Sequence, residues 1–207
     1  SVYSMDGDMA PLQEIIELKQ KYSFELIVDE AHAGGVYGSQ GAGLCVELGL
    51  ENEIFARVVT FGKAWGNAGA VVLGSETLRS YLINFARPFI YSTAPTPHHV
   101  LSLQTTLSFV AKAEIHRQLL KETIQYFKSL QKSDAWGASE TAIQTFFVPG
   151  NEAVRAVAKH VQEAGFAVKP IVYPTVPKGK ERIRITLTAK TSRADIQTLI
   201  NTLETHA

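Results

Sequence analysis

The chain has 207 residues, and its 20 Lys and Arg balance its 20 Asp and Glu, so its formal charge is zero. This neutrality argues against nucleic acid or an anionic membrane as a partner, because both need a broad basic surface. A content of 45% hydrophobic and 19% charged residues excludes a disordered class, and no apolar run reaches the roughly 18 residues of a membrane helix. Cys45 is the single cysteine, so a reducing, cytoplasm-like compartment is expected.

The first half of the chain alternates a helical stretch with short β-rich runs, which predicts an α/β arrangement. Pro11 suits the first turn of a helix, and the apolar spacing after it predicts a helix that ends near residues 22–23. Three apolar runs then predict strands at residues 24–28, 57–61 and 70–74. The first run is of the kind that is buried in parallel sheets.

The pattern changes at about residue 98, where apolar positions up to residue 127 predict one long amphipathic helix. Strands are expected at residues 142–148, 167–172 and 182–188. A helix capped by Asn151 is expected after the first of these strands. A final helix, begun by Ser192 with Asp195 at capping-box spacing, is expected after the last. We therefore predict a boundary between residues 1–97, part of an α/β domain, and residues 98–207, a connecting helix with a small α+β domain.

Four polar side chains lie at or just beyond the ends of the first two predicted strands. Asp29 and His32 follow the first strand, and Thr60 and Lys63 mark the end of the second. Open α/β sheets bind their ligands beyond the carboxyl ends of their strands. The sequence therefore predicts a ligand site at this edge.

Lys63 stands between an apolar strand and a loop of small residues, which favours partial burial over the exposure of an ordinary surface lysine. A desolvated lysine is a competent amine nucleophile for carbonyl chemistry. Such chemistry needs an electron sink that no side chain supplies, which suggests pyridoxal phosphate. Asp29 is then the candidate acid that keeps the pyridine nitrogen protonated.

Two rival interpretations of the string D-E-A-H at residues 29–32 fail on the rest of the sequence. Some nucleic-acid helicases bind magnesium through such a string, but they need a phosphate loop of the form G-x-x-x-x-G-K-[ST], and Lys63 is followed by Ala64. A metal site on Asp29 and His32 would need a second ligand cluster, and the sequence offers none. No metal is expected.

Three features remain open between a functional and a structural interpretation. The glycines at positions 34–43 could cradle a phosphate or form a tight, irregular loop. Ser92 and Thr93 could donate their hydroxyls to a phosphate or serve a plain turn. Arg182 and Arg184 alternate along a predicted strand, so they share a face, where one could clamp a carboxylate or both could be surface residues.

Several motifs in fixed order resemble the α-oxoamine synthases, fold-type-I pyridoxal phosphate enzymes that condense an amino acid with an acyl thioester. The resemblance covers essentially the whole chain. It rests on residues 3–8 (YSMDGD), 28–32 (VDEAH), 60–64 (TFGKA), 85–87 (FAR), 90–93 (IYST), 174–177 (PTVP) and 182–188 (RIRITLT). It implies that the chain holds part of a large, mainly parallel-sheet domain and the small carboxyl-terminal α+β domain.

The resemblance also implies roles toward the cofactor. Lys63 would hold pyridoxal phosphate covalently and later move the α-proton, and Asp29 would pair with the pyridine nitrogen. His32 and Ser4 would hydrogen-bond near the phenolic oxygen of the ring, and Thr60 would contact the phosphate.

Toward the substrates, the resemblance implies that Arg184 clamps the carboxylate of the amino acid and that Thr175 contacts substrate. Within the family the motifs are most similar to the biotin-pathway members, which condense L-alanine with a pimeloyl thioester on coenzyme A or acyl carrier protein. Val172 stands where some of those members carry arginine, and Tyr173-Pro174 is more similar to the glycine acyltransferases. The glycine acyltransferase reaction therefore stays open as an alternative.

Family enzymes place their active sites at a homodimer interface, so a homodimer is expected. The resemblance implies that the family's amino-terminal part lies outside these residues, including a histidine that stacks on the cofactor ring. A catalytically silent fragment or interaction domain is the alternative of another class.

Overall fold

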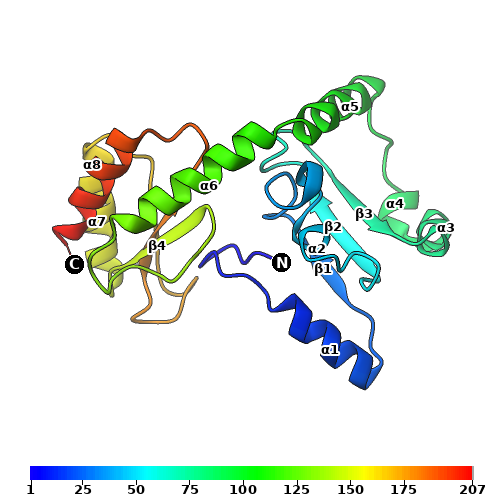
Figure 1. The fold of residues 1–207 in the computed structure, drawn as a ribbon, viewed down its shortest axis with the longest axis horizontal. Coiled ribbons are helices and arrows are strands. Elements are labelled where there is room, and N and C mark those ends of the chain that lie inside the picture. Colours follow the sequence, from blue (N-terminus) through cyan, green and yellow to red (C-terminus); the bar gives the residue numbers. More distant parts are fainter. Residues whose placement is uncertain (207) are drawn as a thin grey trace. The chain divides into compact units, whose positions relative to one another are not determined.

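A computed structural model describes residues 1–206, and its contacts divide the chain into two compact units. Unit 1 comprises Ser1–Val2 and Met9–Glu114, and unit 2 comprises Tyr3–Asp8 and the chain from Ile115 onward (Figure 1). Among the described residues, no helix has the length and apolar character needed to cross a membrane. The division lies one helix downstream of residue 97, where the sequence places a domain boundary.

Unit 1 is built on a three-stranded sheet in the order β1-β2-β3. Strand β1 pairs with β2 in parallel, with Asp29 opposite Val58, and β2 pairs with β3 antiparallel. The elements are α1 (Leu12–Tyr22), β1 (Ile27–Asp29), the 3-10 helix η1 (Ser39–Gly41), α2 (Leu44–Glu47), β2 (Ala56–Thr60), β3 (Ala70–Gly74), α3 (Glu76–Phe85), α4 (Arg87–Ile90) and α5 (Pro97–Ala111).

The predicted α/β character of this half is confirmed, with small shifts at the strand ends. Helix α1 buries Leu12 and Ile16, and it ends where Ser23 adopts a left-handed conformation, with φ 52°, and donates its N–H to the carbonyl of Lys19. This is where the sequence predicts the helix to end. The first strand begins three residues later than predicted, because residues 24–26 link the helix cap to the sheet.

The prediction of one long helix from residue 98 is wrong, because two helices occupy that stretch. Helix α5 ends at Ala111, and α6 begins at Glu114. Between them, the N–H groups of Lys112 and Ala113 bond to carbonyls three residues back, at 3.1 Å each. Such tight turns interrupt the α-helical ladder.

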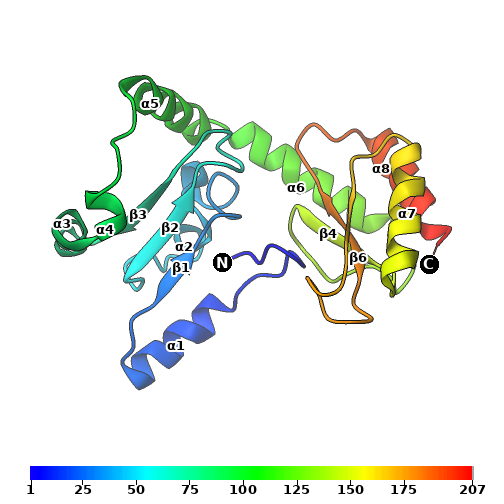
Figure 2. The same cartoon turned by 180° about the vertical axis from the view of Figure 1, so that it is seen from behind.

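Unit 2 is an antiparallel sheet in the order β4-β6-β5 packed against three helices, α6, α7 and α8. Figure 2 shows α7 and α8 side by side, and contacts between the two helices agree. The elements are α6 (Glu114–Ser129), β4 (Ile143–Phe147), α7 (Asn151–Glu163), β5 (Lys169–Ile171), β6 (Arg182–Thr186) and α8 (Arg193–Glu204). Fully buried core side chains come from both layers and include Phe127, Phe146, Val154, Ile183 and Leu203.

Of the two predicted helix caps in unit 2, one is confirmed and one is wrong. The Ser192 hydroxyl accepts the N–H of Asp195 at 3.1 Å at the start of α8. Asn151 does not cap α7, because Gly150 occupies the cap position without a side-chain bond. Instead, the Asn151 side chain bonds to both backbone groups of Tyr173, at 2.9 and 3.2 Å.

Candidate functional site

The predicted site residues fall into two sets, one in each unit. In unit 1 the carboxyl ends of β1 and β2 lie next to each other, because the two strands are parallel and paired. Asp29 ends β1 opposite Val58, and Thr60 ends β2 two residues further on. The structure therefore brings Asp29, Thr60 and the following Lys63 loop to one edge of the sheet, as the sequence predicts.

Asp29 and His32 stand on the turn that leaves β1. One carboxylate oxygen of Asp29 accepts the N–H of Ala31 at 2.7 Å, and the backbone carbonyl of Asp29 accepts the amino-terminal ammonium group of Ser1, also at 2.7 Å. His32 is half-buried. Asp29 is exposed at the strand end. Its second carboxylate oxygen is therefore suited to contact a ligand.

Thr60 and Lys63 differ in burial. The hydroxyl oxygen of Thr60 is buried and has no hydrogen-bond partner within residues 1–206. A buried polar group without a partner is costly, so it is a sign of a missing ligand or water. Lys63 is exposed, and the expectation that apolar strands bury it is wrong, since the loop that carries it extends beyond the end of β2.

The loop after Lys63 packs against the glycines that follow His32. The indole nitrogen of Trp65 would lie 3.4 Å from a Cβ placed on either Gly34 or Gly35, and Gly35 has a φ of +87°. Closer still, a Cβ on Gly34 would lie 2.8 Å from Cγ1 of Val59, and one on Gly35 would lie 3.0 Å from Cβ of Ala64. The glycine loop is therefore a close-packing device beside the Lys63 loop, which agrees with the structural interpretation of these glycines.

Glu30 is a residue that the sequence reasoning missed. Its carboxylate is fully buried, accepts the N–H of Leu44 at 2.5 Å and that of Cys45 at 3.3 Å, and forms an ion pair with Arg57 at 3.1 Å. Glu30, which lies between Asp29 and His32 in the sequence, therefore joins the end of β1 to α2 and β2. Strand alternation was the available signal, since it places Glu30 on the face opposite to Asp29.

Ser92 and Thr93 lie in the exposed connection between α4 and α5. The Ser92 hydroxyl donates to the carbonyl of Pro88. This contact matches the plain-turn interpretation of Ser92, and a role toward phosphate remains a prediction for both residues.

In unit 2 the structure brings two predicted site residues together. The Nε of Arg184, on β6, donates to the backbone carbonyl of Ser4 at 2.7 Å, and its Nη1 donates to Thr186 at 3.1 Å. Burial lowers the pKa of Arg184. Thr175 is exposed, and its N–H donates to the carbonyl of Val172 at 2.9 Å in the turn after β5.

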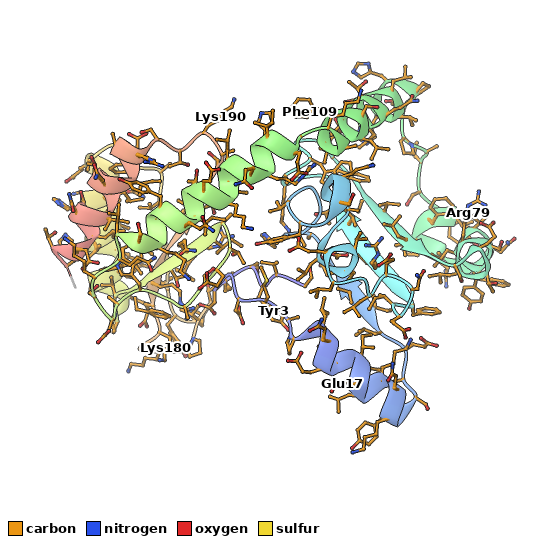
Figure 3. All side chains as sticks on the ribbon, viewed as in Figure 1. Tyr3, Glu17, Arg79, Phe109, Lys180 and Lys190 are labelled. Atoms are coloured by element: carbon orange, nitrogen blue, oxygen red, sulfur yellow. The ribbon has the colours of Figure 1, made fainter. Side chains whose placement is uncertain are left out.

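Further contacts, also missed from the sequence, attach the segment of residues 3–8 to unit 2 (Figure 3, where Tyr3 is labelled). Asp6 pairs with Arg182, whose guanidinium is almost fully buried and lies 4.7 Å over the ring of Phe147. The Ser139 hydroxyl donates to the carbonyl of Gly7 at 3.0 Å. Arg182 is therefore a structural partner of this segment, which leaves Arg184 as the candidate carboxylate clamp.

No group of three or more His, Cys, Asp or Glu residues able to hold a metal ion occurs within residues 1–206. The edge of the sheet in unit 1 presents an amine, a carboxylate, an imidazole and one hydroxyl, from Lys63, Asp29, His32 and Thr60. Such a set suits carbonyl chemistry on a phosphate-bearing cofactor.

Comparisons with known proteins agree with this chemistry. The aminotransferase class I and II family matches residues 1–203. A curated 8-amino-7-oxononanoate synthase from Serratia proteamaculans is 43% identical over 204 residues, which are 98% of this chain and 53% of that protein. The chain thus spans about half the length of the curated relatives it matches.

Solved structures show the same likeness in three dimensions. An 8-amino-7-oxononanoate synthase from Francisella tularensis superposes with a TM-score of 0.85 at 27% identity, over 99% of this chain and 60% of that one. A structure of SPT with PLP as an internal aldimine superposes with a TM-score of 0.87 at 26% identity, over 99% and 52% of the two chains. The predicted fold class, that of the fold-type-I transferases, is confirmed.

Proposed function

The chain belongs to the aminotransferase class I and II family, and on that premise we propose that it supplies the lysine-bearing half of an 8-amino-7-oxononanoate synthase. The proposed reaction joins L-alanine to a pimeloyl thioester of coenzyme A or acyl carrier protein. Carbon dioxide and the free thiol leave, and the product serves biotin biosynthesis. The similarity to curated synthases at about 40% identity supports this choice within the family.

The observation that carries the proposal is the meeting of Asp29, Thr60 and Lys63 at the carboxyl edge of β1 and β2. Each residue brings a group that pyridoxal phosphate requires: an acid, a hydroxyl donor and an amine. The buried Thr60 hydroxyl without a partner fits a phosphate oxygen as its missing acceptor. The residues present therefore fit this cofactor.

Pyridoxal phosphate, when bound, supplies the electron sink that side chains lack. Asp29 would hold a proton on the pyridine nitrogen through its exposed carboxylate oxygen. Lys63 would bind the cofactor through Nζ and take the proton from the α-carbon of the amino acid. His32 and Ser4 would donate hydrogen bonds to the ring oxygen.

Phosphate binding would use hydroxyl donors as well as Thr60. Ser92 and Thr93 are the further candidates, and both lie exposed on their connection. Hydroxyl groups are suitable donors to phosphate oxygens because they rotate to the geometry of the acceptor.

For the amino acid, Arg184 is the candidate clamp in unit 2. Its bonds to Ser4 and Thr186 engage Nε and one hydrogen of Nη1, so the other guanidinium hydrogens can receive a carboxylate. The bond to Ser4 also fixes the plane of the guanidinium, and a fixed plane favours bidentate recognition. Thr175 would contact substrate from the turn after β5.

The first test is a titration of the 207-residue chain with pyridoxal phosphate, followed by visible absorbance. We expect an absorbance band that disappears in Lys63→Ala, and borohydride reduction should leave the cofactor mass on the peptide that contains Lys63. The exposed Lys112→Ala serves as the matched control and should keep the band. Absence of any lysine-dependent band would overturn the proposal and favour a catalytically silent interaction domain.

A second candidate, a glycine acyltransferase, is favoured by Tyr173-Pro174 before Thr175. The two reactions differ in the amino acid that Arg184 would receive. Spectral titration of the cofactor-loaded chain with L-alanine and with glycine separates them. Tighter binding of L-alanine supports the synthase, whereas much tighter binding of glycine would assign the acyltransferase.

The proposal includes a homodimer. Unit 1 exposes large apolar side chains on β3 and on the helices that follow it, and such surfaces are typical of packing against further protein. They are Val72, Leu73, Tyr81, Ile83, Phe85, Phe89, Ile90, Tyr91, Val100, Leu101, Leu107 and Phe109. Light scattering after size exclusion should give twice the 22.7 kDa chain mass, and a monomer at micromolar concentration would contradict the dimer.

A further inference from the structure

The loop that carries Lys63 is closed on itself around Phe61. The N–H of Phe61 donates to the carbonyl of Gly69 at 2.9 Å, and the carbonyl of Phe61 accepts the N–H of Asn67 at 2.7 Å. Within the loop, the carbonyl of Lys63 accepts the N–H of Gly66 at 3.0 Å. The backbone of Lys63 is thus connected to Asn67 through short hydrogen-bonded turns.

Asn67 in turn connects this loop to α5. Its Nδ2 donates to the hydroxyl of Ser102 at 2.9 Å and to that of Thr106 at 3.2 Å, while its Oδ1 accepts the N–H of Ala68 at 2.8 Å. Ser102 and Thr106 are four residues apart on one helix, so their hydroxyls face the same side. One half-buried amide therefore joins two elements that are more than 30 residues apart in sequence.

The proposed role of Lys63 requires that the backbone of its loop be held in place. Lysine has a flexible four-carbon side chain, and Lys63 is exposed, so packing of its own side chain does little to place the amine. Its position depends mainly on the loop backbone. Small displacements of a reacting group from its productive geometry cost large factors in reactivity.

We propose that Asn67 is a positioning residue for Lys63, because it holds the loop of residues 61–69 against α5. The inference rests on the proposed function in assigning the cofactor to Lys63. The hydrogen bonds of the loop are a property of the free protein, so they can be tested without the cofactor.

The test compares three variants of the full chain with the wild type. Asn67→Leu removes all three side-chain bonds and keeps the same number and branching of side-chain heavy atoms. Asn67→Asp keeps the acceptor for Ala68, and the hydroxyls of Ser102 and Thr106 can rotate to donate to it, so it is the conservative rescue. The matched control is Asn84→Leu, since Asn84 lies exposed on α3 and its side chain donates to the carbonyl of Ser80 in its own helix.

The first measurement is amide hydrogen exchange of residues 61–69 in the free protein. We expect protection of the Phe61 and Asn67 amides to fall about ten-fold in Asn67→Leu, the factor that corresponds to 1.4 kcal/mol. Asn67→Asp and Asn84→Leu should keep wild-type protection. Wild-type protection in Asn67→Leu would overturn the inference, whether or not the chain binds pyridoxal phosphate.

The second measurement is the Kd for pyridoxal phosphate from the Lys63-dependent absorbance. We expect Asn67→Leu to raise the Kd about ten-fold and Asn67→Asp to restore it. If wild type binds and Asn67→Leu binds equally well, the positioning role is refuted while the proposed function stands. If Asn67→Leu does not fold, the double variant Ser102→Ala/Thr106→Val tests the same bonds from α5, and unchanged loop protection in it refutes the inference.

Discussion

Removal of the Glu30 carboxylate should selectively destabilise unit 1. This carboxylate is fully buried, while the side chain of its partner Arg57 is 13% exposed. It also accepts the N–H groups of Leu44 and Cys45 at the start of α2. Glu30→Ala therefore leaves two backbone donors without their acceptor and a mostly buried guanidinium without its carboxylate, with the Ala42 carbonyl at 3.2 Å as its remaining partner.

Loss of one partner of a buried ion pair costs about 3–5 kcal/mol. Partial exposure of Arg57 lets water screen its remaining charge, so we place the cost for Glu30→Ala near the lower end, at about 3 kcal/mol. With an m value of about 1–1.5 kcal/mol/M in urea, the unfolding midpoint should fall by about 2–3 M. The double variant Glu30→Gln/Arg57→Met should recover more than about 1 kcal/mol, because it removes the unpaired charge and keeps an acceptor.

The assay uses the two tryptophans of the chain, of which Trp65 lies in unit 1 and Trp136 in unit 2. Urea unfolding is followed by Trp65 fluorescence in a Trp136→Phe background. Glu76→Gln is the matched control, since Glu76 pairs with Arg79 on an exposed helix face and should change stability by less than about 0.5 kcal/mol. A loss below about 1 kcal/mol in Glu30→Ala would refute the buried-pair argument.

Three further predictions concern single groups. Burial, and then the nearby Glu30 carboxylate, raise the pKa of Cys45 to about 12. Its thiol should therefore react with Ellman's reagent at pH 8 at least about 100-fold more slowly than a free thiol. A rate equal to that of the urea-unfolded chain would contradict this. Burial alone would raise the pKa of Glu204, but its hydrogen bonds, above all from Trp136, lower that pKa below the ordinary glutamate value of 4.5. The stability it contributes is therefore present above that pH and lost as pH falls through the lowered pKa; Glu204→Gln should flatten this acid dependence in Trp136-monitored unfolding, and an unchanged slope would refute the assignment. A Cβ on Gly7, whose φ is +73°, would meet the Ser139 hydroxyl, whereas one on Gly165, whose φ is +96°, would meet open space. Gly7→Ala should therefore lower the free energy of unfolding of unit 2 by more than about 1 kcal/mol beyond the loss in Gly165→Ala. Equal losses would show that lack of space is not the cause.

Local patterns predicted the backbone of this protein well where they carry a direct physical signal. The apolar spacing after Pro11, the strand at residues 70–74 and the Ser192 cap all appear in the structure. The same reasoning failed where two signals compete within a few residues. The apolar stripe of residues 98–127 continues across the turn at Lys112 and Ala113, so periodicity alone does not reveal the break.

The candidate site divides along the same line. The sequence alone determined that Asp29, Thr60 and Lys63 follow strand ends, because strand ends are encoded in adjacent residues. Contacts between distant residues became visible only in three dimensions: Glu30 with Arg57 and Asn67 with α5 in unit 1, and Ser4 with Arg184, 180 residues away, in unit 2. These contacts join residues far apart in the chain, and their geometry arises from packing, which no short-range pattern encodes.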